Sequence, residues 1–442
     1  MASSWKHRVS VVLAVFASLT LGVWAAPSAD AHDFESSYLY IDVGKSELGG
    51  RVELPYESMR AVFGLDLDGS TGEVLLELEE HADTLLAYVR AHTAIGAAGE
   101  QWGVEFSGVN VFEDVHFGAK GYAYFPFEVD VPVAEVPQVL EFTFDPFLDE
   151  LPDRSNLVLL RNDLLRGVID KEDVSLTALD AQRRSASVDL GDASQWKNFN
   201  GSIGIGVDHI ATGPDHILFI FVLVLPSVLV LQATWRPAPS FGTALWRVLK
   251  VVSMFTVAHS ITFSLAGLDV LPLPPSQVVE IVIALSIAAA ALHNLWPVLQ
   301  QREWIIAFAF GLFHGMGFAG LVEALDVSRT TQLVSLLGRN VGIEIGQVVI
   351  VLVAFPALFI LSRTVYYGRV FVAASVTLAG VSFVWAFERI VSVDVGLTDQ
   401  IIRVVRWPRS LIGAIAVTLV ALLLYERERR SGNLVPLEAT VG

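Results

Sequence analysis

The chain has 442 residues, 53% of them hydrophobic, and a formal net charge of −18 at pH 7. A chain this long and this apolar is not a single soluble globule, so we expect part of it in a lipid bilayer. Residues 32–200 hold 32 Asp and Glu against 12 Lys and Arg, a balance of −20, which leaves +2 elsewhere. An acidic half of this kind excludes a nucleic-acid-binding surface, which needs clustered Lys and Arg.

The chain contains no cysteine. Disulfides, iron–sulfur clusters and thiolate metal sites are therefore excluded. Any bound metal must be held by His, carboxylate, amide or carbonyl groups.

Residues 1–31 have the pattern of a secretory signal peptide. A basic stretch from Lys6 to Arg8 precedes the apolar run VSVVLAVFASLTLGVWAA, and Ala29-Asp30-Ala31 is a small-residue cleavage pattern. The apolar run is long for a signal peptide, so an uncleaved signal anchor is the alternative. We expect the residues that follow to be exported from the cytoplasm.

Residues 32–190 predict an antiparallel β-sandwich-like domain. Short β-rich runs are separated by Gly, Pro and Asp, and they include SYLYIDVG, GGRVELPY, GYAYFPFEVDV and QVLEFTFDPF. The segment 72–95 instead has helical spacing of Leu and Ala, which indicates a helix packed on the sheet. Residues 191–202 are polar and rich in Gly, Asn and Ser, and they predict a linker.

The rest of the chain predicts an all-α polytopic membrane bundle of about seven transmembrane helices over residues 203–425, followed by a cytoplasmic tail over 426–442. The expected spans are 203–230, 248–268, 277–298, 304–323, 341–361, 369–388 and 409–425. Short cytoplasmic loops carry excess Lys and Arg, and this rule places four basic loops inside if the N-terminal domain is outside. The loop 389–408 disagrees, although its amphipathic spacing is typical of a segment lying in the membrane interface.

The first expected span opens with GVDHIATGPDH (206–216), where ionisable groups are costly. On a continuous helix, His209 and His216 would stand about 10.5 Å apart, too far for one ion to contact both. Gly213-Pro214 predicts a break, with a new helix beginning at Pro214. Such a break lets His209 fold back toward Asp215 and His216, as broken helices do in transporters.

Three further spans each carry one ionisable group within apolar sequence, namely His259, His314 and Glu344. With His209, Asp215 and His216, they form the predicted metal-binding set. A lone buried His is often only an interhelical hydrogen-bonding group, but the joint pattern favours a shared ion site. The predicted second shell or ion pathway comprises Asp208, Glu280, Asn294, Asn340 and Gln347.

Imidazole and carboxylate ligands without thiolate suit nickel, cobalt, zinc or copper(II), and the nitrogen content disfavours magnesium and calcium. The residues alone do not choose among these metals.

Five segments in order resemble the HupE/UreJ family, in particular its long branch with an exported N-terminal domain. They are GVDHIATGPDHILFIFVLVL, FTVAHSITFSLAGL, VVEIVIALSIAAAALHN, FGLFHGMGFAGLV and NVGIEIGQ. The family's His-x-x-x-Gly-x-Asp-His element falls on His209, Gly213, Asp215 and His216. The resemblance implies a multi-pass membrane protein that handles nickel or cobalt, in the shorter members as a secondary permease.

We therefore expect a secondary carrier that moves a divalent transition metal inward, rather than an enzyme; no nucleotide-binding motif is present. A membrane-embedded metalloenzyme or metal-dependent assembly factor is the alternative. A third hypothesis is an envelope receptor whose exported domain binds a protein partner.

Overall fold

The computed structural model describes residues 36–112, 121–169, 174–231, 235–268, 270–299, 302–317, 328–391 and 409–435. The predicted signal segment 1–31 lies outside these residues. The chain divides into two compact units. The sheet unit holds the described residues up to Ser202 together with 328–338. The helical unit holds the described residues from Ile203 to 317 and from Arg339 to 435.

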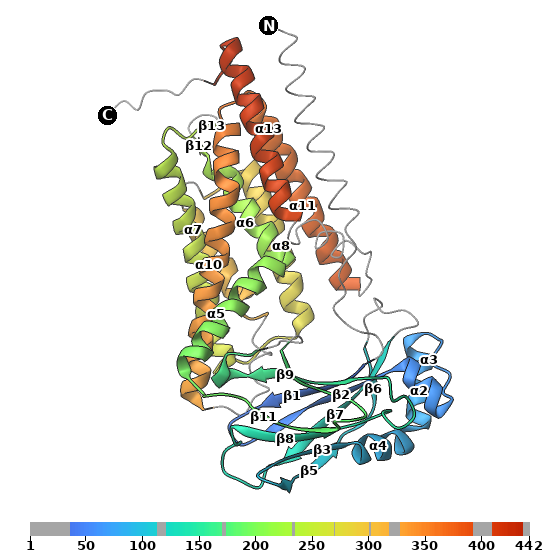
Figure 1. Ribbon diagram of the computed structural model, residues 1–442. Helices are drawn as coiled ribbons and strands as arrows, with labels where there is room; N and C mark the ends of the chain where they lie inside the picture. The colour runs from blue at the N-terminus through green and yellow to red at the C-terminus, as the bar shows by residue number, and fades with distance from the viewer. Residues whose placement is uncertain are drawn as a thin grey trace. The chain divides into compact units, whose positions relative to one another are not determined.

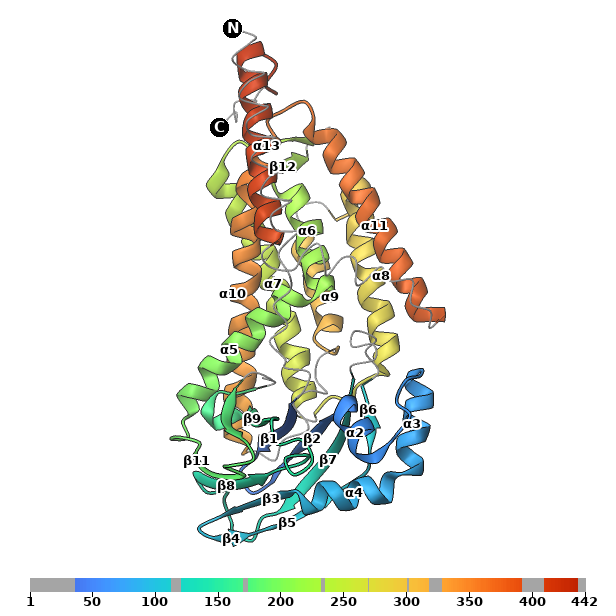
Figure 2. The same cartoon turned by 45° about the vertical axis from the view of Figure 1, so that its right-hand side comes forward.

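The sheet unit contains two β-sheets (Figures 1 and 2). The first has the strand order β10-β9-β1-β2-β7-β5, with β6 also paired to β7, and the second has the order β11-β8-β3-β4. The strands are β1 (Ser37–Val43), β2 (Leu48–Pro55), β3 (Thr93–Ala97), β4 (Glu100–Gln101), β5 (Gly103–Phe106), β6 (Asn110–Val111), β7 (Tyr122–Asp130), β8 (Val139–Phe144), β9 (Asn156–Asp163), β10 (Ser175–Leu179) and β11 (Ser185–Asp189).

β-Sheets in the N-terminal region are confirmed, but the first sheet is mixed rather than purely antiparallel. β1 pairs with β9 in parallel, and Arg161 and Asn162 of β9 both donate hydrogen bonds to Asp42 of β1. Parallel neighbours need a long connection, and more than 100 residues separate these two strands. Local periodicity carries no signal for such a pairing.

The expected helix 72–95 is two helices and the start of a strand. α3 (Thr71–Glu80) begins with a capping box between Ser70 and Glu73, and it ends before His81. α4 (Ala82–Ala91) follows, and β3 then begins at Thr93 and pairs with β8. A further helix, α2 (Tyr56–Phe63), precedes them. Both sheets contribute to one hydrophobic core, for example through Val52 and Phe142.

The segment 191–202 is not an extended linker, because α5 (Gln195–Thr212) begins within it. Its polar side chains instead bond to the first turns of α10 (Arg329–Leu361). Asn198 Nδ2 donates to the carbonyl oxygen of Thr331 at 2.9 Å, and the hydroxyls of Ser202 and Ser335 lie 2.9 Å apart. A composition typical of a linker here serves a polar helix contact.

The helical unit consists mainly of long helices that run side by side (Figures 1 and 2). Besides α5 and α10, they are α6 (Pro214–Ser227), α7 (Phe241–Gly267), α8 (Ser276–Leu295), α9 (Glu303–His314), α11 (Tyr367–Val391) and α13 (Arg409–Ser431), with a hairpin of β12 (Leu229–Leu231) and β13 (Trp235–Pro237).

Within the described residues, four helices are long and apolar enough to cross a membrane: α7, α8, α10 and α11. The bent pair α5 and α6 is a fifth candidate. Seven spans are thus not shown. α9 has only 12 residues and ends at His314, where a turn through Gly315 and Gly317 follows; a helix of that length covers about 18 Å, less than a bilayer core. α13 covers the seventh predicted span but is not among the candidates.

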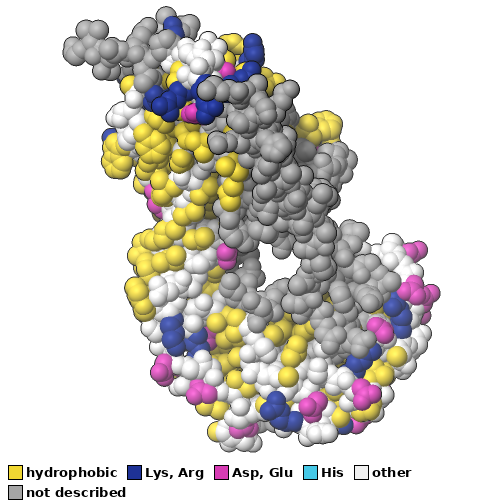
Figure 3. Space-filling view, turned by 45° about the horizontal axis from the view of Figure 1, so that its top comes forward, with side chains coloured by type: hydrophobic (Ala, Val, Ile, Leu, Met, Phe, Trp, Pro, Cys, Tyr) yellow, Lys and Arg dark blue, Asp and Glu magenta, His cyan; other side chains and the backbone are white. Residues whose placement is uncertain are grey.

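Basic side chains gather at one end of the helical unit, beside a flank of exposed hydrophobic side chains (Figure 3). There Arg247 donates to the carbonyl oxygens of Ser227 and Leu229, and Arg363 donates to that of Ala238. We call this the basic end; it is formed by Arg236, Arg247, Arg302, Arg363, Arg369, Arg427, Arg429 and Arg430.

The opposite end of the bundle holds Arg389, from the loop that disagreed with the predicted orientation. Its guanidinium pairs with Glu280, and Gln277 Nε2 donates to its carbonyl oxygen at 2.6 Å. The charge of Arg389 is therefore balanced locally. Arg403 and Arg406, from the same loop, lie outside the described residues.

Candidate metal centre

The helix break at Gly213-Pro214 shapes the centre. Gly213 has extended backbone angles, φ −76° and ψ 108°, and α6 begins at Pro214 as predicted. The axes of α5 and α6 differ by 71°. As a result, the ring centroids of His209 and His216 lie 4.4 Å apart.

The break also brings in residues from two other helices. His259 on α7 lies 6.3 Å from His209 and 6.0 Å from His216, centroid to centroid. His314 on α9 lies 5.7 Å from His216. Five of the six predicted metal ligands therefore meet in one cluster, the four histidines and Asp215.

Two overlapping triads within this cluster have suitable spacing for a metal ion. In each triad, one ligand atom per residue lies within 4.8 Å of the others. The first triad is His209, His216 and His259, and the second is Asp215, His216 and His314. His216 belongs to both, so the triads are adjacent and share a ligand.

Glycines on α9 set its distance from α7. A Cβ at Gly311 would overlap the carbonyl oxygen of Phe255, and one at Gly315 would overlap that of His259. Close approach through small residues is the usual way in which membrane helices pack tightly. Here it places His314 of α9 against the same stretch of α7 that carries His259.

Hydrogen bonds orient two of the rings. Ser286 on α8 donates its hydroxyl proton to the carbonyl oxygen of Ile283 at 2.7 Å, so its oxygen accepts from His314 Nε2–H at 3.1 Å. The lone pair of His314 then lies on Nδ1. Asp215 Oδ1 lies 3.0 Å from His216 Nδ1 and accepts from it, which leaves the lone pair of His216 on Nε2. Such outer contacts fix the ring and tautomer of metal-binding His residues.

These nitrogens are buried and without hydrogen-bond partners among the described residues. They are Nε2 of His216, Nδ1 of His314 and both ring nitrogens of His259. His259 is fully buried, and His216 and His314 are only 3% and 2% exposed. Leaving several polar atoms unpaired in an apolar interior costs free energy, and a bound metal ion would satisfy one nitrogen of each ring that it contacts.

Glu344, the sixth predicted ligand, lies in neither triad and instead accepts a hydrogen bond from Ser253. Two other predicted residues of α10, Asn340 and Gln347, make similar contacts. Asn340 donates to Ser264 at 3.5 Å, and Gln347 accepts from Thr256 at 2.8 Å. All three side chains of α10 thus bond to hydroxyls of α7.

The other predicted second-shell or pathway residues belong to neither triad. Asp208 is exposed, and Glu280 pairs with Arg389. Asn294 has a structural contact, because its Nδ2 donates to the carbonyl oxygen of Val222 at 3.0 Å. Val222 is four residues before Pro226, which has no N–H to offer that carbonyl. Asn294 therefore replaces a missing helical hydrogen bond.

A phenylalanine layer lies one helical turn from the His residues, toward the basic end. Phe219 follows His216 on α6, Phe255 precedes His259 on α7, and Phe310 precedes His314 on α9. The ring of Phe219 contacts those of Phe255 and Phe310, at centroid distances of 4.8 and 6.3 Å. The layer also packs on the cluster, with Phe255 4.9 Å from His314. Sequence periodicity gave no signal that separated these rings from ordinary core.

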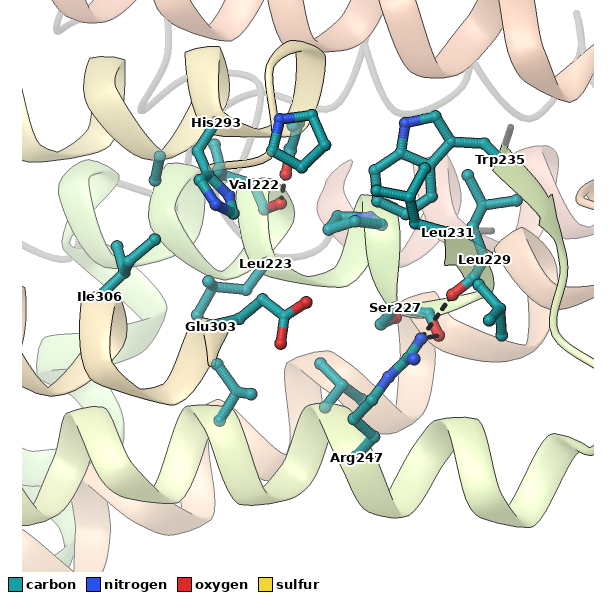
Figure 4. Close-up of a pocket in the computed structure, with 17 residues that line it drawn as sticks. Val222, Leu223, Ser227, Leu229, Leu231, Trp235, Arg247, His293, Glu303 and Ile306 are labelled. Atoms are coloured by element: carbon teal, nitrogen blue, oxygen red, sulfur yellow. Dashed lines mark hydrogen bonds between the residues drawn. The ribbon is translucent and has the colours of Figure 1, made fainter. Parts of the chain in front are cut away.

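One further turn toward the basic end, a cavity opens between the same helices. Its wall includes Val222, Val251 and Ile306, and its polar groups include His293 and Glu303. Figure 4 shows these two side chains on one side of the cavity and Arg247 on the other. Along α6, α7 and α9, the order is thus ligand cluster, phenylalanine layer, cavity.

The comparisons address the helical part of the chain. The family described as HupE / UreJ protein matches residues 184–389. This segment, somewhat less than half of the chain, is thus similar to HupE/UreJ proteins. No curated protein and no solved structure matches the chain. The resemblance expected from the five segments is confirmed, and all five residues of the cluster lie within the matched range.

The HupE/UreJ family is associated with nickel and cobalt uptake. The match also agrees with the several apolar helices that are long enough to cross a bilayer.

Proposed function

We propose that this protein binds a divalent transition metal ion, nickel or cobalt, at His209, Asp215, His216, His259 and His314, and moves it through the membrane as a secondary permease. The observation that carries the proposal is the meeting of four imidazoles and one carboxylate from four helices. Buried ring nitrogens of His216, His259 and His314 have no hydrogen-bond partner among the described residues.

The ligand chemistry supports a borderline metal. Imidazole nitrogen suits nickel, cobalt, zinc and copper, whereas magnesium and calcium require oxygen ligands. One carboxylate, Asp215, offsets only part of a divalent charge. The bound ion would therefore keep a net positive charge, which favours release over permanent storage.

The two overlapping triads support movement. An ion held by His209, His216 and His259 can exchange ligands one at a time, because His216 also belongs to the triad with Asp215 and His314. A shared ligand lets the ion pass between neighbouring positions without losing all its protein contacts. The phenylalanine layer then separates these positions from the cavity at the basic end.

The direction of the path follows from charge placement. Loops on the cytoplasmic side of membrane proteins carry excess Lys and Arg, so we place the basic end in the cytoplasm and the N-terminal domain outside. On this orientation, the His cluster would be reached from outside and the cavity with Glu303 and His293 would open inward.

The test is uptake of nickel or cobalt by liposomes that contain the purified protein. The variants His216→Ala and His314→Ala should each lose metal accumulation by at least tenfold while retaining the size-exclusion profile of the unmodified protein. His81→Ala is the matched control, since this imidazole lies between α3 and α4 of the sheet unit, outside both the cluster and the cavity. Undiminished uptake in both cluster variants would disprove the proposal.

Elemental analysis distinguishes the metalloenzyme alternative. A carrier should lose its metal on dialysis and show flux in liposomes. Stoichiometric metal that survives dialysis, without any flux, would instead favour a resident catalytic or structural ion.

A further inference from the structure

A second polar site lies on the other side of α7, away from the imidazoles. Two i, i+3 pairs face each other there: Ser253 and Thr256 on α7, and Glu344 and Gln347 on α10. Ser253 donates to Glu344 Oε1, and Thr256 donates to Gln347 Oε1 at 2.8 Å. We call these four residues the oxygen quartet, because they can supply a ligand only with oxygen atoms.

Hydrogen bonds that hold α7 and α10 together account for some polar atoms of the quartet but not for all of them. The hydrogen bonds engage Glu344 Oε1 and the amide oxygen of Gln347. Glu344 Oε2 is buried and has no hydrogen-bond partner among the described residues. A carboxylate oxygen without a partner is costly at membrane depth, so the site calls for a proton or a cation.

The rim of the site is apolar where it faces outward from the helices. Ser253, Thr256 and Glu344 line a groove between α7 and α10. Its rim carries Val257 and Ile261, which are 48% and 44% exposed on a hydrophobic flank that lipid would cover. The polar atoms thus lie beneath an apolar edge.

Charge and donor type define the ligand. Glu344 is the one ionisable side chain among the residues that line the groove, so a single positive charge neutralises the site. A divalent ion would leave a net charge next to lipid. Oxygen donors suit hard ions, and two neighbouring pairs of oxygen-bearing side chains offer a metal ion more ligands than a proton needs, since a proton requires one acceptor.

We propose that the oxygen quartet binds a monovalent alkali cation, Na⁺, separately from the transition metal. Ser260, Ser264 and Asn340 continue the same polar lining away from the basic end and offer a path to the site. The groove and the His cluster share α7, through Thr256 and His259. Binding of an ion at one site can therefore change the affinity of the other site through α7.

The experiment is equilibrium binding of ²²Na⁺ to the purified full-length protein in detergent, with choline chloride as background salt and a chelator to remove transition metals. We expect saturable binding that falls at least tenfold in Glu344→Gln and clearly in Thr256→Val, both of nearly unchanged shape. Thr262→Val is the matched control, because that hydroxyl bonds only to backbone of its own helix among the described residues.

The same assay on His314→Ala separates this site from the metal proposal, since the variant should bind ²²Na⁺ normally whether or not it moves nickel. Absence of saturable binding in the unmodified protein would overturn the inference. So would equal binding in Glu344→Gln and Thr262→Val, or a carboxyl group that responds to pH but not to Na⁺.

Discussion

Gly315 packs directly on the backbone of His259. A Cβ at position 315 would overlap the carbonyl oxygen of His259 and the hydroxyl oxygen of Thr262. The backbone angles of Gly315, φ −65° and ψ −18°, are open to any residue, so glycine is required by contact and not by conformation. The position of His314 next to His259 thus requires that residue 315 have no side chain.

Gly315→Ala should push α9 away from α7 and destabilise the protein by about 1–3 kcal/mol, as overpacking does. Metal affinity should fall with it, because His314 moves away from His216. Thermal unfolding in detergent and calorimetric titration with nickel measure the two effects. Gly380→Ala is the control: its added Cβ meets nothing within 4 Å, so the protein should be unchanged or slightly more stable. Similar behaviour of the two variants would contradict the packing argument.

Ser286→Ala should weaken metal binding by about 10–100-fold with little effect on folding, because Ser286 fixes the ring of His314 without being a ligand. Nickel titration of the purified protein is the measurement. Ser382→Ala removes an equally buried hydroxyl that bonds to the carbonyl oxygen of Leu378, and it should leave nickel affinity intact. An unaltered affinity in Ser286→Ala would show that the hydrogen bond does not position the ring.

Asn294→Leu should destabilise the protein by about 1–3 kcal/mol, since it leaves the carbonyl oxygen of Val222 buried without a donor. The cost should nearly vanish in a Pro226→Ala background, where residue 226 regains an N–H for that carbonyl. A double-mutant cycle on thermal unfolding measures this coupling. Additive effects of the two substitutions would refute the assignment of Asn294 to a helix-bracing role.

Phe255→Leu should open the phenylalanine layer and increase downhill nickel flux through liposomes several-fold. The smaller side chain fills less of the space between the His cluster and the cavity. Phe371 of α11 has a buried ring that packs on Trp235, away from this layer. The control variant Phe371→Leu should therefore leave the nickel flux unchanged. Flux that does not differ between the two variants would argue against a barrier at this layer.

The absence of native cysteine makes the orientation directly testable. A single cysteine at Ser431, beside the basic end, should be labelled by a membrane-impermeant maleimide only after the membrane is opened. A cysteine at the exposed residue Gln101 of the sheet unit should be labelled in intact cells or spheroplasts. The reverse pattern would invert the proposed direction of transport.

Local chemistry made the broken helix predictable. A Gly-Pro pair ends one helix and starts the next, and α6 begins at the expected Pro214. The convergence of the four His residues was also within reach, because an ionisable group in an apolar span needs a polar neighbour. Six such groups occur along the chain: His209, Asp215, His216, His259, His314 and Glu344.

Long-range pairing lay beyond sequence reasoning. Glu344 was expected beside the imidazoles, but it faces Ser253 instead, since periodicity gives a face of α10 and not the helix that the face meets. Asn294 was expected as a second-shell or pathway residue, and its hydrogen bond to Val222 on another helix could not be predicted from periodicity. The parallel pairing of β1 with β9 was not predicted either, because the local pattern of a strand does not indicate which distant strand it pairs with.

The five clustered side chains come from α5, α6, α7 and α9, whose positions in the chain extend over more than 100 residues. A captured ion would act as a removable cross-link among them, so the cargo itself would set the stiffness of the bundle. Amide hydrogen exchange in these four helices should slow on loading and quicken on release, which makes rigidity a readout of occupancy.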